Sequence, residues 1–323
     1  MHHTTTKLLA GLLWVAATAA LADRSDWPSD FIVGTASHDS TYDVYGSGWA
    51  NLIADELGLS GSGAVTGGPL QNLALVNGGD LAFGLTTLGP AADAVAGQSP
   101  LAPGVPMDNA CALFPMYATP FSITALSSSG ITSIAGIPDG TRIGFGPSAS
   151  TADAYFSAIL EALGVSFERR NGSWNELSAQ LQEGQLDVIA FAADLPIPVV
   201  SRLAGQTDVN IIAFTEEEQA RVLETFPVSE YWIPASADTT LEEDVRAVAM
   251  WNFAIARCDL PEDFVYEVTR VTMENNDKLR DVHHVAETTI PENIVHNAVL
   301  PFHPGAARWY TEHGYEIDES LIR

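Results

Sequence analysis

The passage that most constrains the fold lies near the start of the chain, where a short apolar run leads into a hydroxyl-rich loop and then into a helical pattern. Residues 31–33 are typical of a buried strand, residues 34–48 are rich in small and hydroxyl side chains, and apolar residues fall at helical spacing over 49–57. In an open α/β sheet, ligands bind beyond the carboxyl ends of strands, where helix N–H groups lack partners. This passage therefore predicts one side of a ligand site.

A second unit of the same make spans residues 141–164. A strand pattern leads into a turn, and Ser148, Ser150 and Thr151 follow as candidate helix caps. Apolar residues at 152–163 fall on one helical face, and a glycine at 164 ends the pattern. We expect the two loops to face each other across a cleft and to close on one small molecule, although we find no internal repeat in the sequence.

The elements after the first loop predict an α/β fold with a parallel sheet. A short strand at 64–68, a helix from Pro69 and a buried strand at 80–87 continue a βαβαβ series. Short connections in this order imply right-handed crossovers between parallel strands. Residues 90–109 are rich in Pro, Gly and Ala, so we expect them to be irregular.

The long apolar run over 111–126 contains Pro115 and Pro120. Proline cannot donate a ladder hydrogen bond, so this run is expected to be an edge strand or a crossing between domains. Periodicity predicts further strands at 187–193, 209–214 and 245–258. It also predicts further helices after the capping-box pattern at 173–176, over 263–283 and after Pro304.

The N-terminus has the pattern of a secretory signal. Lys7 precedes an apolar run at 8–19, and Ala20-Leu21-Ala22 is a small-residue cleavage site. The alternative, an uncleaved membrane anchor, is disfavoured because the apolar run is short for a membrane span. We expect cleavage after Ala22 and a periplasmic protein.

The chain beyond the signal is longer than one comfortable core, which favours two domains. We expect residues 1–22 to form the signal peptide, residues 23–116 and 230–323 to form domain 1, and residues 117–229 to form domain 2. The two crossings between the domains would make a hinge with a well-defined closure.

Composition excludes some partners and leaves one question open. The chain has 14 Lys and Arg against 41 Asp and Glu, for a formal net charge of −27. Nucleic acid is excluded, since phosphate binding needs a basic face, and so acidic a surface suggests a saline habitat. Cys111 and Cys258 either pair in an oxidising compartment or remain as buried free thiols.

The sequence contains few catalytic or metal-binding patterns. The sequence lacks His-Glu-x-x-His and Cys-x-x-Cys motifs, and the neighbouring His283 and His284 are expected to lie in solvent. We therefore expect no catalytic residue, metal or cofactor. A Gly-x-Gly-x-x-Ala pattern at 144–149 keeps a dinucleotide-dependent enzyme open as an alternative, although Pro147 removes an N–H that could face a pyrophosphate.

Neutral hydrogen-bonding side chains recur instead at the predicted strand ends. Singly, each could merely cap a helix or close a turn. Their recurrence at successive strand ends indicates a polar ligand site, with these candidates: Thr41, Tyr42, Thr66, Asn72, Thr86, Ser148, Ser150 and Thr151.

At this point the sequence resembles a known family, the TAXI-type solute-binding proteins of TRAP transporters. The resemblance rests on five blocks in order: GTASHDSTYDVYGSG, TGGPLQNLALVNGGDLAFG, IGFGPSASTADAY, LPIPVVSRLA and PFHPGAARWYTEHGY. It implies the type II periplasmic-binding-protein fold, with two α/β domains joined by a hinge and a ligand between them. By matching motif, it implies ligand contacts at Thr41, Tyr42, Asn72, Ser148, Ser150 and Thr151.

The resemblance also implies a function, and at one point the sequence departs from the family pattern. Members capture small carboxylates such as glutamate, glutamine or 2-oxoglutarate and deliver them to a membrane permease driven by an ion gradient. Here Asp43 and Val44 stand where the family usually has Tyr-Pro, so the Asp43 carboxylate either turns away from an anionic ligand or receives an ammonium group. We expect a monomeric transport receptor that closes on its solute; an exported sensor for a receptor kinase is the main alternative.

Overall fold

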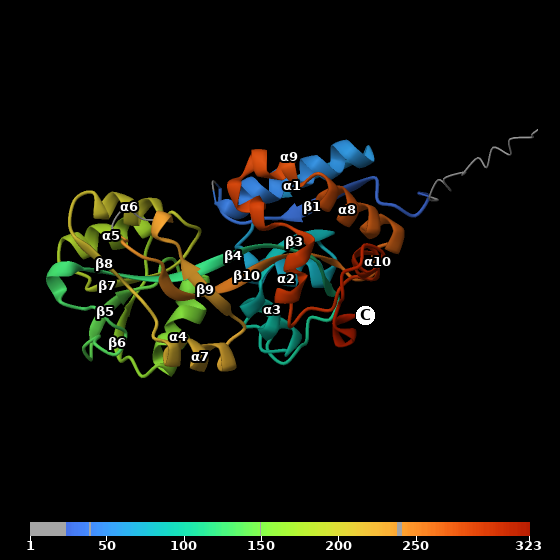
Figure 1. Ribbon diagram of the computed structural model, residues 1–323. Coiled ribbons are helices and arrows are strands. Elements are labelled where there is room, and N and C mark those ends of the chain that lie inside the picture. The colour runs from blue at the N-terminus through green and yellow to red at the C-terminus, as the bar shows by residue number, and fades with distance from the viewer. Residues whose placement is uncertain (1–23, 39, 149, 238–240) are drawn as a thin grey trace, which may run out of the picture.

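The computed structural model describes residues 24–38, 40–148, 150–237 and 241–323. The predicted signal peptide and its cleavage site therefore lie outside the described residues. Two lobes of helices and strands lie side by side, and the chain passes between them along two long strands, β4 (Ala110–Leu126) and β10 (Val245–Arg257) (Figure 1). The fold is mixed α/β, as the order of elements predicts.

One ten-stranded sheet runs through the described part of the chain, in the order β2-β1-β3-β10-β4-β7-β5-β6, with β8 paired to β4 and β9 paired to β10. The strands β1, β2 and β3 are parallel, which confirms the parallel sheet expected for the first βαβαβ series, and β5, β6 and β7 are parallel as well. The strand bounds are β1 Asp30–Gly34, β2 Ser60–Ala64, β3 Phe83–Thr87, β4 Ala110–Leu126, β5 Thr141–Gly144, β6 Phe167–Arg170, β7 Val188–Ala192, β8 Val209–Ile212, β9 Ser229–Ile233 and β10 Val245–Arg257.

The two longest strands, β4 and β10, lie at the centre of the sheet and not at an edge. They pair antiparallel with each other, and β10 also pairs with β3, whereas the far half of β4 pairs with β7 and β8. The register shifts near Pro115, and this irregularity accommodates a proline inside a central strand. The predicted domain boundaries at 116/117 and 229/230 stay a prediction.

Helices cover both faces of the sheet. Their bounds are α1 Thr41–Leu57, α2 Pro69–Gly78, α3 Leu88–Val95, α4 Ser157–Ala162, α5 Trp174–Gln182, α6 Pro198–Ala204, α7 Glu216–Thr225, α8 Glu262–Glu274, α9 Asn276–Val282 and α10 Pro304–Glu312. A π-helical turn, Ala152–Phe156, runs directly into α4, and 3-10 turns lie at Ser127–Ser129, Ala235–Ala237, His284–Thr288, Pro291–His296 and Glu319–Leu321. Among these described helices, none combines the length and apolar character that crossing a bilayer requires.

Helix α1 begins earlier than the glycines of its sequence suggest. It starts at Thr41, and Ser40 caps it by accepting a hydrogen bond from the Asp43 N–H at 3.2 Å. Gly46 and Gly48 are therefore helical and serve packing: a Cβ at Gly46 would lie 2.8 Å from a methyl group of Thr35, and one at Gly48 would lie 2.5 Å from Val282. The expectation of a loop reaching residue 48 was wrong, because close packing and not a turn requires these glycines.

Two other local expectations needed correction. Helix α3 occupies part of the region expected to be irregular, since Pro90 falls in its first turn, where proline is tolerated. The helix expected over 263–283 is broken at Asn275, between α8 and α9. The capping box predicted at 173–176 is confirmed, because Ser173 and Glu176 exchange side-chain to backbone hydrogen bonds.

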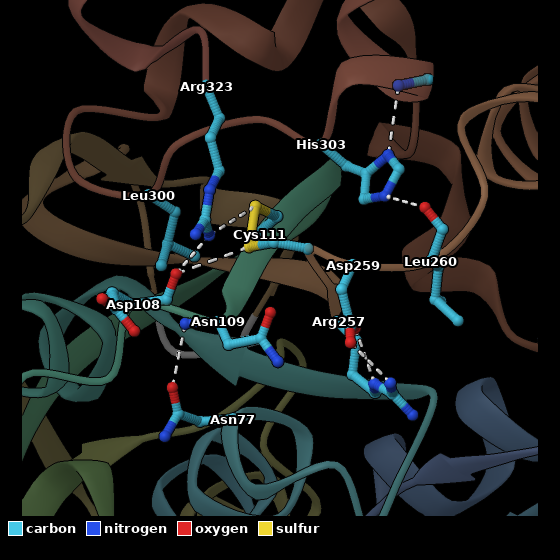
Figure 2. The surroundings of a disulfide bond; sticks show 12 residues. Asn77, Asp108, Asn109, Cys111, Arg257, Asp259, Leu260, Leu300, His303 and Arg323 are labelled. Atoms are coloured by element: carbon cyan, nitrogen blue, oxygen red, sulfur yellow. Dashed lines mark hydrogen bonds and ion pairs between the residues drawn. A yellow bond between two sulfur atoms is a disulfide. The ribbon is translucent and has the colours of Figure 1, made fainter.

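The structure answers the question about the cysteines. Cys111, near the start of β4, and Cys258, just after β10, form a disulfide with a Cα–Cα distance of 5.1 Å. Figure 2 shows the surroundings of this bond, where the C-terminal Arg323 side chain donates to the carbonyl of Asp108. The disulfide therefore joins the outer ends of the two central strands.

Candidate functional site

The two predicted half-sites are built on a short internal repeat that the sequence analysis missed. Ser40 and Ser150 each cap the helix that follows, accepting at 3.2 Å from the N–H of Asp43 and of Asp153 respectively. Each serine opens the same pattern, Ser-Thr-x-Asp-x-Tyr-x-Ser, and a glycine stands six residues before it at the end of a strand. The expectation of no internal repeat was wrong, and aligning the two predicted loops would have revealed it.

A hydrogen bond between the lobes marks the candidate site. The Thr41 hydroxyl, in the first turn of α1, donates to Oδ2 of Asp194, which follows β7 in the second half of the chain. Among the described residues, no arginine or lysine forms an ion pair with Asp194. Sequence reasoning missed Asp194. Its position at the end of a buried strand, directly before the LPIPVVSRLA block, was the available signal.

The surroundings of Asp194 disfavour its negative charge. Burial raises the pKa of its carboxyl group, and the hydrogen bond from Thr41 and the nearby His283 and His284 oppose that rise. Burial lowers the pKa of His283, and His284 adds to that effect. His283 is half-buried, so the expectation that both histidines lie in solvent was wrong for His283 and is confirmed for the exposed His284.

The negative charge of Asp194 affects the pKa values of three tyrosines. Burial is the main cause that raises the pKa of Tyr42, Tyr117 and Tyr231, and the negative charge of Asp194 adds to it in each case. The Asp194 carboxyl group thus bonds to one threonine hydroxyl, its charge acts on three phenol groups, and two imidazoles act on it. This cluster, Thr41, Tyr42, Tyr117, Asp194, Tyr231 and His283 with the adjacent His284, is called the Asp194 cluster below.

Tyr42 also ties α1 to the two central strands. Its hydroxyl donates to Oδ1 of Asn252 at 2.7 Å, and the Asn252 amide donates to the Tyr117 carbonyl and to the Thr119 hydroxyl, both at 2.8 Å. Thr87 is directly opposite Asn252 in the sheet. Its hydroxyl is buried and finds no hydrogen-bond partner within the described residues. A polar network therefore lies beside the Asp194 cluster, where β4 and β10 pass between the lobes.

Asn72 lies in α2 and Thr86 in β3, and no hydrogen bond between described residues joins either of them to the Asp194 cluster. The fully buried Asn72 amide donates to the carbonyls of Thr35 and Leu85 at 2.8 Å and accepts from the Thr66 hydroxyl at 2.7 Å. The Thr86 hydroxyl lies 3.4 Å from the carbonyl of Pro69, the first residue of α2. The polar atoms of Asn72 thus join the segments that follow β1 and β2 to strand β3.

The other three predicted residues, Ser148, Ser150 and Thr151, lie at the start of the second helix. Ser148 is exposed. The Ser150 hydroxyl donates to the Phe145 carbonyl at 3.1 Å while it caps the helix, and Thr151 follows as the first residue of that helix. No hydrogen bond between described residues joins this trio to Thr41 or Tyr42. The eight predicted residues therefore form three groups, with Thr66 bonded to Asn72, and their shared role stays a prediction.

A second contact joins the lobes through the repeat. The Tyr155 hydroxyl, in the π-helical turn, donates to Oδ2 of Asp93 in α3 at 2.5 Å. The Tyr155 ring packs on Gly89, where a Cβ would lie 2.6 Å from it. Burial raises the pKa of Tyr155, and the hydrogen bond to Asp93 and its charge raise it further. This pair fastens α3 to the second lobe.

Asp43, the residue that departs from the family pattern, has two partners within its own lobe. Its carboxylate accepts from the Thr35 hydroxyl at 3.3 Å and lies 3.4 Å from Nδ1 of the exposed His38. The described residues contain no group of three or more His, Cys, Asp or Glu side chains that could hold a metal ion.

This arrangement, two α/β lobes joined by central strands with polar groups where they meet, is the two-domain fold of periplasmic solute-binding proteins. The structure resembles MatC from Rhodopseudomonas palustris with bound malate (14% identity, TM-score 0.54, 88% of this chain and 97% of that chain). It also resembles a TctC solute-binding protein from Polaromonas (13% identity, TM-score 0.53, 79% and 88%). A third similar structure is an R. palustris protein with adipate (14% identity, TM-score 0.50, 88% and 99%). The NMT1-like family model matches residues 33–314, and the chain belongs to that family.

Proposed function

We propose that the protein is an exported, periplasmic solute receptor of the TAXI type. It captures a small carboxylate or amino acid between its lobes and delivers it to the membrane permease of a TRAP transporter. The observation that carries the proposal is the Thr41–Asp194 hydrogen bond, which places a polar cluster on both sides of the boundary between the lobes. Binding, and not catalysis, is the activity proposed for this cluster.

Three further observations support a small organic acid or amino acid as the class of solute. Structures of the same fold hold malate and adipate, both small carboxylates. The repeat places two helix starts, at Thr41 and Thr151, beside strand ends, and such N-termini offer N–H donors and a favourable dipole to a carboxylate. The cluster also supplies hydroxyl groups that can orient a polar solute.

Closure of the lobes is the proposed signal to the permease. A permease must distinguish the loaded from the empty receptor, and a ligand shifts such an equilibrium only by binding one form more tightly. The hydrogen bonds Thr41–Asp194 and Tyr155–Asp93 are two contacts between the lobes that opening would break. A solute that bridges the same two lobes would favour the closed form.

The test is a thermal-shift and mass-spectrometric study of the exported protein. Native mass spectrometry identifies the small molecule carried through purification, and a panel of amino acids and mono- and dicarboxylates is then screened for a rise in melting temperature. A solute at 100 times its dissociation constant stabilises the folded form by about 2.7 kcal/mol, which such a measurement detects.

The Thr41→Val variant provides the site control. It should lose most of the rise in melting temperature that the solute causes, whereas Thr225→Val, at an exposed threonine in α7, should keep that rise. If no member of the panel raises the melting temperature and no small molecule copurifies, the proposed solute class is wrong.

A further inference from the structure

Strand β4 contains a bulge where it passes from the first lobe to the second. Asn252 of β10 faces two residues of β4, Met116 and Tyr117, because the pairing of the two strands shifts between Trp251 and Phe253. A bulge interrupts the ladder and bends its strand, so the carbonyl groups of these residues need other partners. The bulge comes before the residues of β4 that pair with β7 in the second lobe, and a bend there changes the angle between the lobes.

The Met116 side of the bulge is fixed to the first lobe by more than one contact. Its carbonyl accepts from the hydroxyl groups of Thr288 at 3.1 Å and Thr289 at 3.0 Å. The Thr289 hydroxyl also lies 2.9 Å from that of Tyr45, in α1. Removing any one of these hydroxyl groups leaves a bond to the Met116 carbonyl in place, so this side of the bulge belongs to the lobe that contains α1.

The Tyr117 side of the bulge is held through Asn252. The amide nitrogen of Asn252 donates to the Tyr117 carbonyl and to the Thr119 hydroxyl, both at 2.8 Å, and the amide oxygen accepts from the Tyr42 hydroxyl at 2.7 Å. Asn252 is 1% exposed, and these bonds use both of its amide hydrogens. Tyr117 and Thr119 follow Met116 along β4, so bending the strand at the bulge would move both acceptors relative to Asn252.

We propose that Asn252 is a positioning residue for closure of the lobes: it couples Tyr42, at the start of α1, to the part of β4 that lies beyond the bulge. The inference rests on the proposed function, since it takes the start of α1 as one side of the solute site. It goes further by naming the contact through which that side acts on the strands between the lobes.

The hydrogen bonds of Asn252 are complete in the form of the protein in which the lobes touch. Hydrogen bonds cross the boundary between the lobes in this form, among them the bond from Thr41 to Asp194. A solute that fixes Tyr42 would therefore favour the closed form. Closure would in turn fix Tyr42 for the solute, because coupling between two sites is reciprocal.

The experiment cuts the two ends of this chain of bonds and leaves Asn252 in place. Tyr42→Phe removes the donor on α1, Thr119→Val removes the acceptor on β4, and both changes keep the shape of the side chain. Thr124→Val is the matched control, because Thr124 is a buried threonine of the same strand whose hydroxyl has no partner among the described residues. Thr119→Ser keeps the hydroxyl and should retain wild-type behaviour. Thermal melting checks that each variant is folded.

Two measurements are made on the single variants and on the double variant. Small-angle X-ray scattering of the solute-free protein reports how far apart the lobes are, and titration calorimetry with glutamate, malate and adipate reports affinity. We expect Tyr42→Phe and Thr119→Val each to weaken affinity about tenfold and to make the solute-free protein more extended. The double variant should differ from either single variant by no more than about twofold, because both changes interrupt one chain of bonds. Thr124→Val should change neither measurement.

The outcomes separate this inference from the proposed function. If the two effects multiply to about 100-fold in the double variant, or if Thr124→Val weakens affinity as much as Thr119→Val, the inference is overturned and the proposed function stands. If the wild type binds none of the three solutes, the proposed solute class is wrong, and the scattering decides the inference. An extension that is equal in the single and double variants then supports it, and scattering that is unchanged, or that extends further in the double variant, overturns it.

Discussion

At the scale of single residues, the most informative side chain is a carboxyl group in a place that disfavours its charge. Asp194 receives a hydrogen bond from Thr41 across the lobe boundary, yet burial still raises its pKa above the ordinary value of 3.8. A folded form that holds a proton more tightly than the unfolded chain is stabilised as the pH falls. Above the raised pKa, the ionised Asp194 reduces the stability of the solute-free protein.

This difference predicts the pH dependence of Asp194→Asn. Without solute, the variant should melt at a higher temperature than the wild type at pH 7, and the difference should shrink as the pH falls through the raised pKa of the wild-type carboxyl group, where that group becomes protonated. Thermal melts of both proteins at several pH values measure the difference. Repeating them in a His283→Gln background removes one of the two imidazoles that act on Asp194. A difference that is constant with pH would contradict the assignment.

Sequence reasoning succeeded for residues whose role is local and failed where the role depends on a distant partner. It predicted Thr41 and Tyr42 in a loop between a strand end and a helix, and the structure keeps both beside the strand end but places them in the first turn of α1. It missed Asp194, because its partner Thr41 is 153 positions away in the chain. It also could not show that the polar atoms of Asn72 bond to the protein itself.

At the scale of elements, the two copies of the repeat have diverged in what their tyrosines do. Tyr45, in α1, lies 2.9 Å from the hydroxyl of Thr289, whereas Tyr155, at the corresponding position of the second copy, donates to Asp93 on the opposite lobe. Tyr45 is wholly buried and supports the packing of α1. Tyr155 is placed to stabilise the form in which the lobes touch.

This divergence predicts different effects for one chemical change. Tyr155→Phe removes a hydrogen bond to a carboxylate between the lobes, so we expect solute affinity to fall about tenfold and the solute-free protein to become more extended in small-angle X-ray scattering. Tyr45→Phe should lower the unfolding free energy by about 1 kcal/mol and leave affinity within about twofold. Equal effects of the two variants on affinity would contradict the role of Tyr155 in stabilising the form in which the lobes touch.

The elements themselves were predicted best where the hydrophobic pattern is regular. The buried strands and the helix after Ser150 follow from periodicity, whereas α1 was placed too late because its glycines suggested a loop. Those glycines are required by close contact with Thr35 and Val282, which lie outside α1. Close packing between elements is the information that a local pattern lacks.

At the scale of the whole molecule, β4 and β10 connect the two lobes, and the disulfide ties their outer ends together. The fold class followed from the order of strands and helices, but the pairing of the cysteines did not, since it depends on the antiparallel register that places Cys111 opposite Ala256. The bond closes a segment of 147 residues, and closing so long a segment removes much entropy from the unfolded chain.

The disulfide therefore predicts a separation of stability from binding. Replacing Cys111 and Cys258 together by alanine should lower the unfolding free energy by up to about 5 kcal/mol, measured by urea unfolding, because the unfolded chain regains that entropy. Solute affinity should stay within about twofold, because the residues that bind the Tyr42 hydroxyl lie further along the two strands, away from the disulfide. These are Asn252, which accepts from Tyr42, and Thr119, which accepts from Asn252. The wild type unfolded in the presence of a reductant should match the variant. A loss of affinity equal to that of Tyr155→Phe would instead mean that the outer ends of β4 and β10 control how the lobes close.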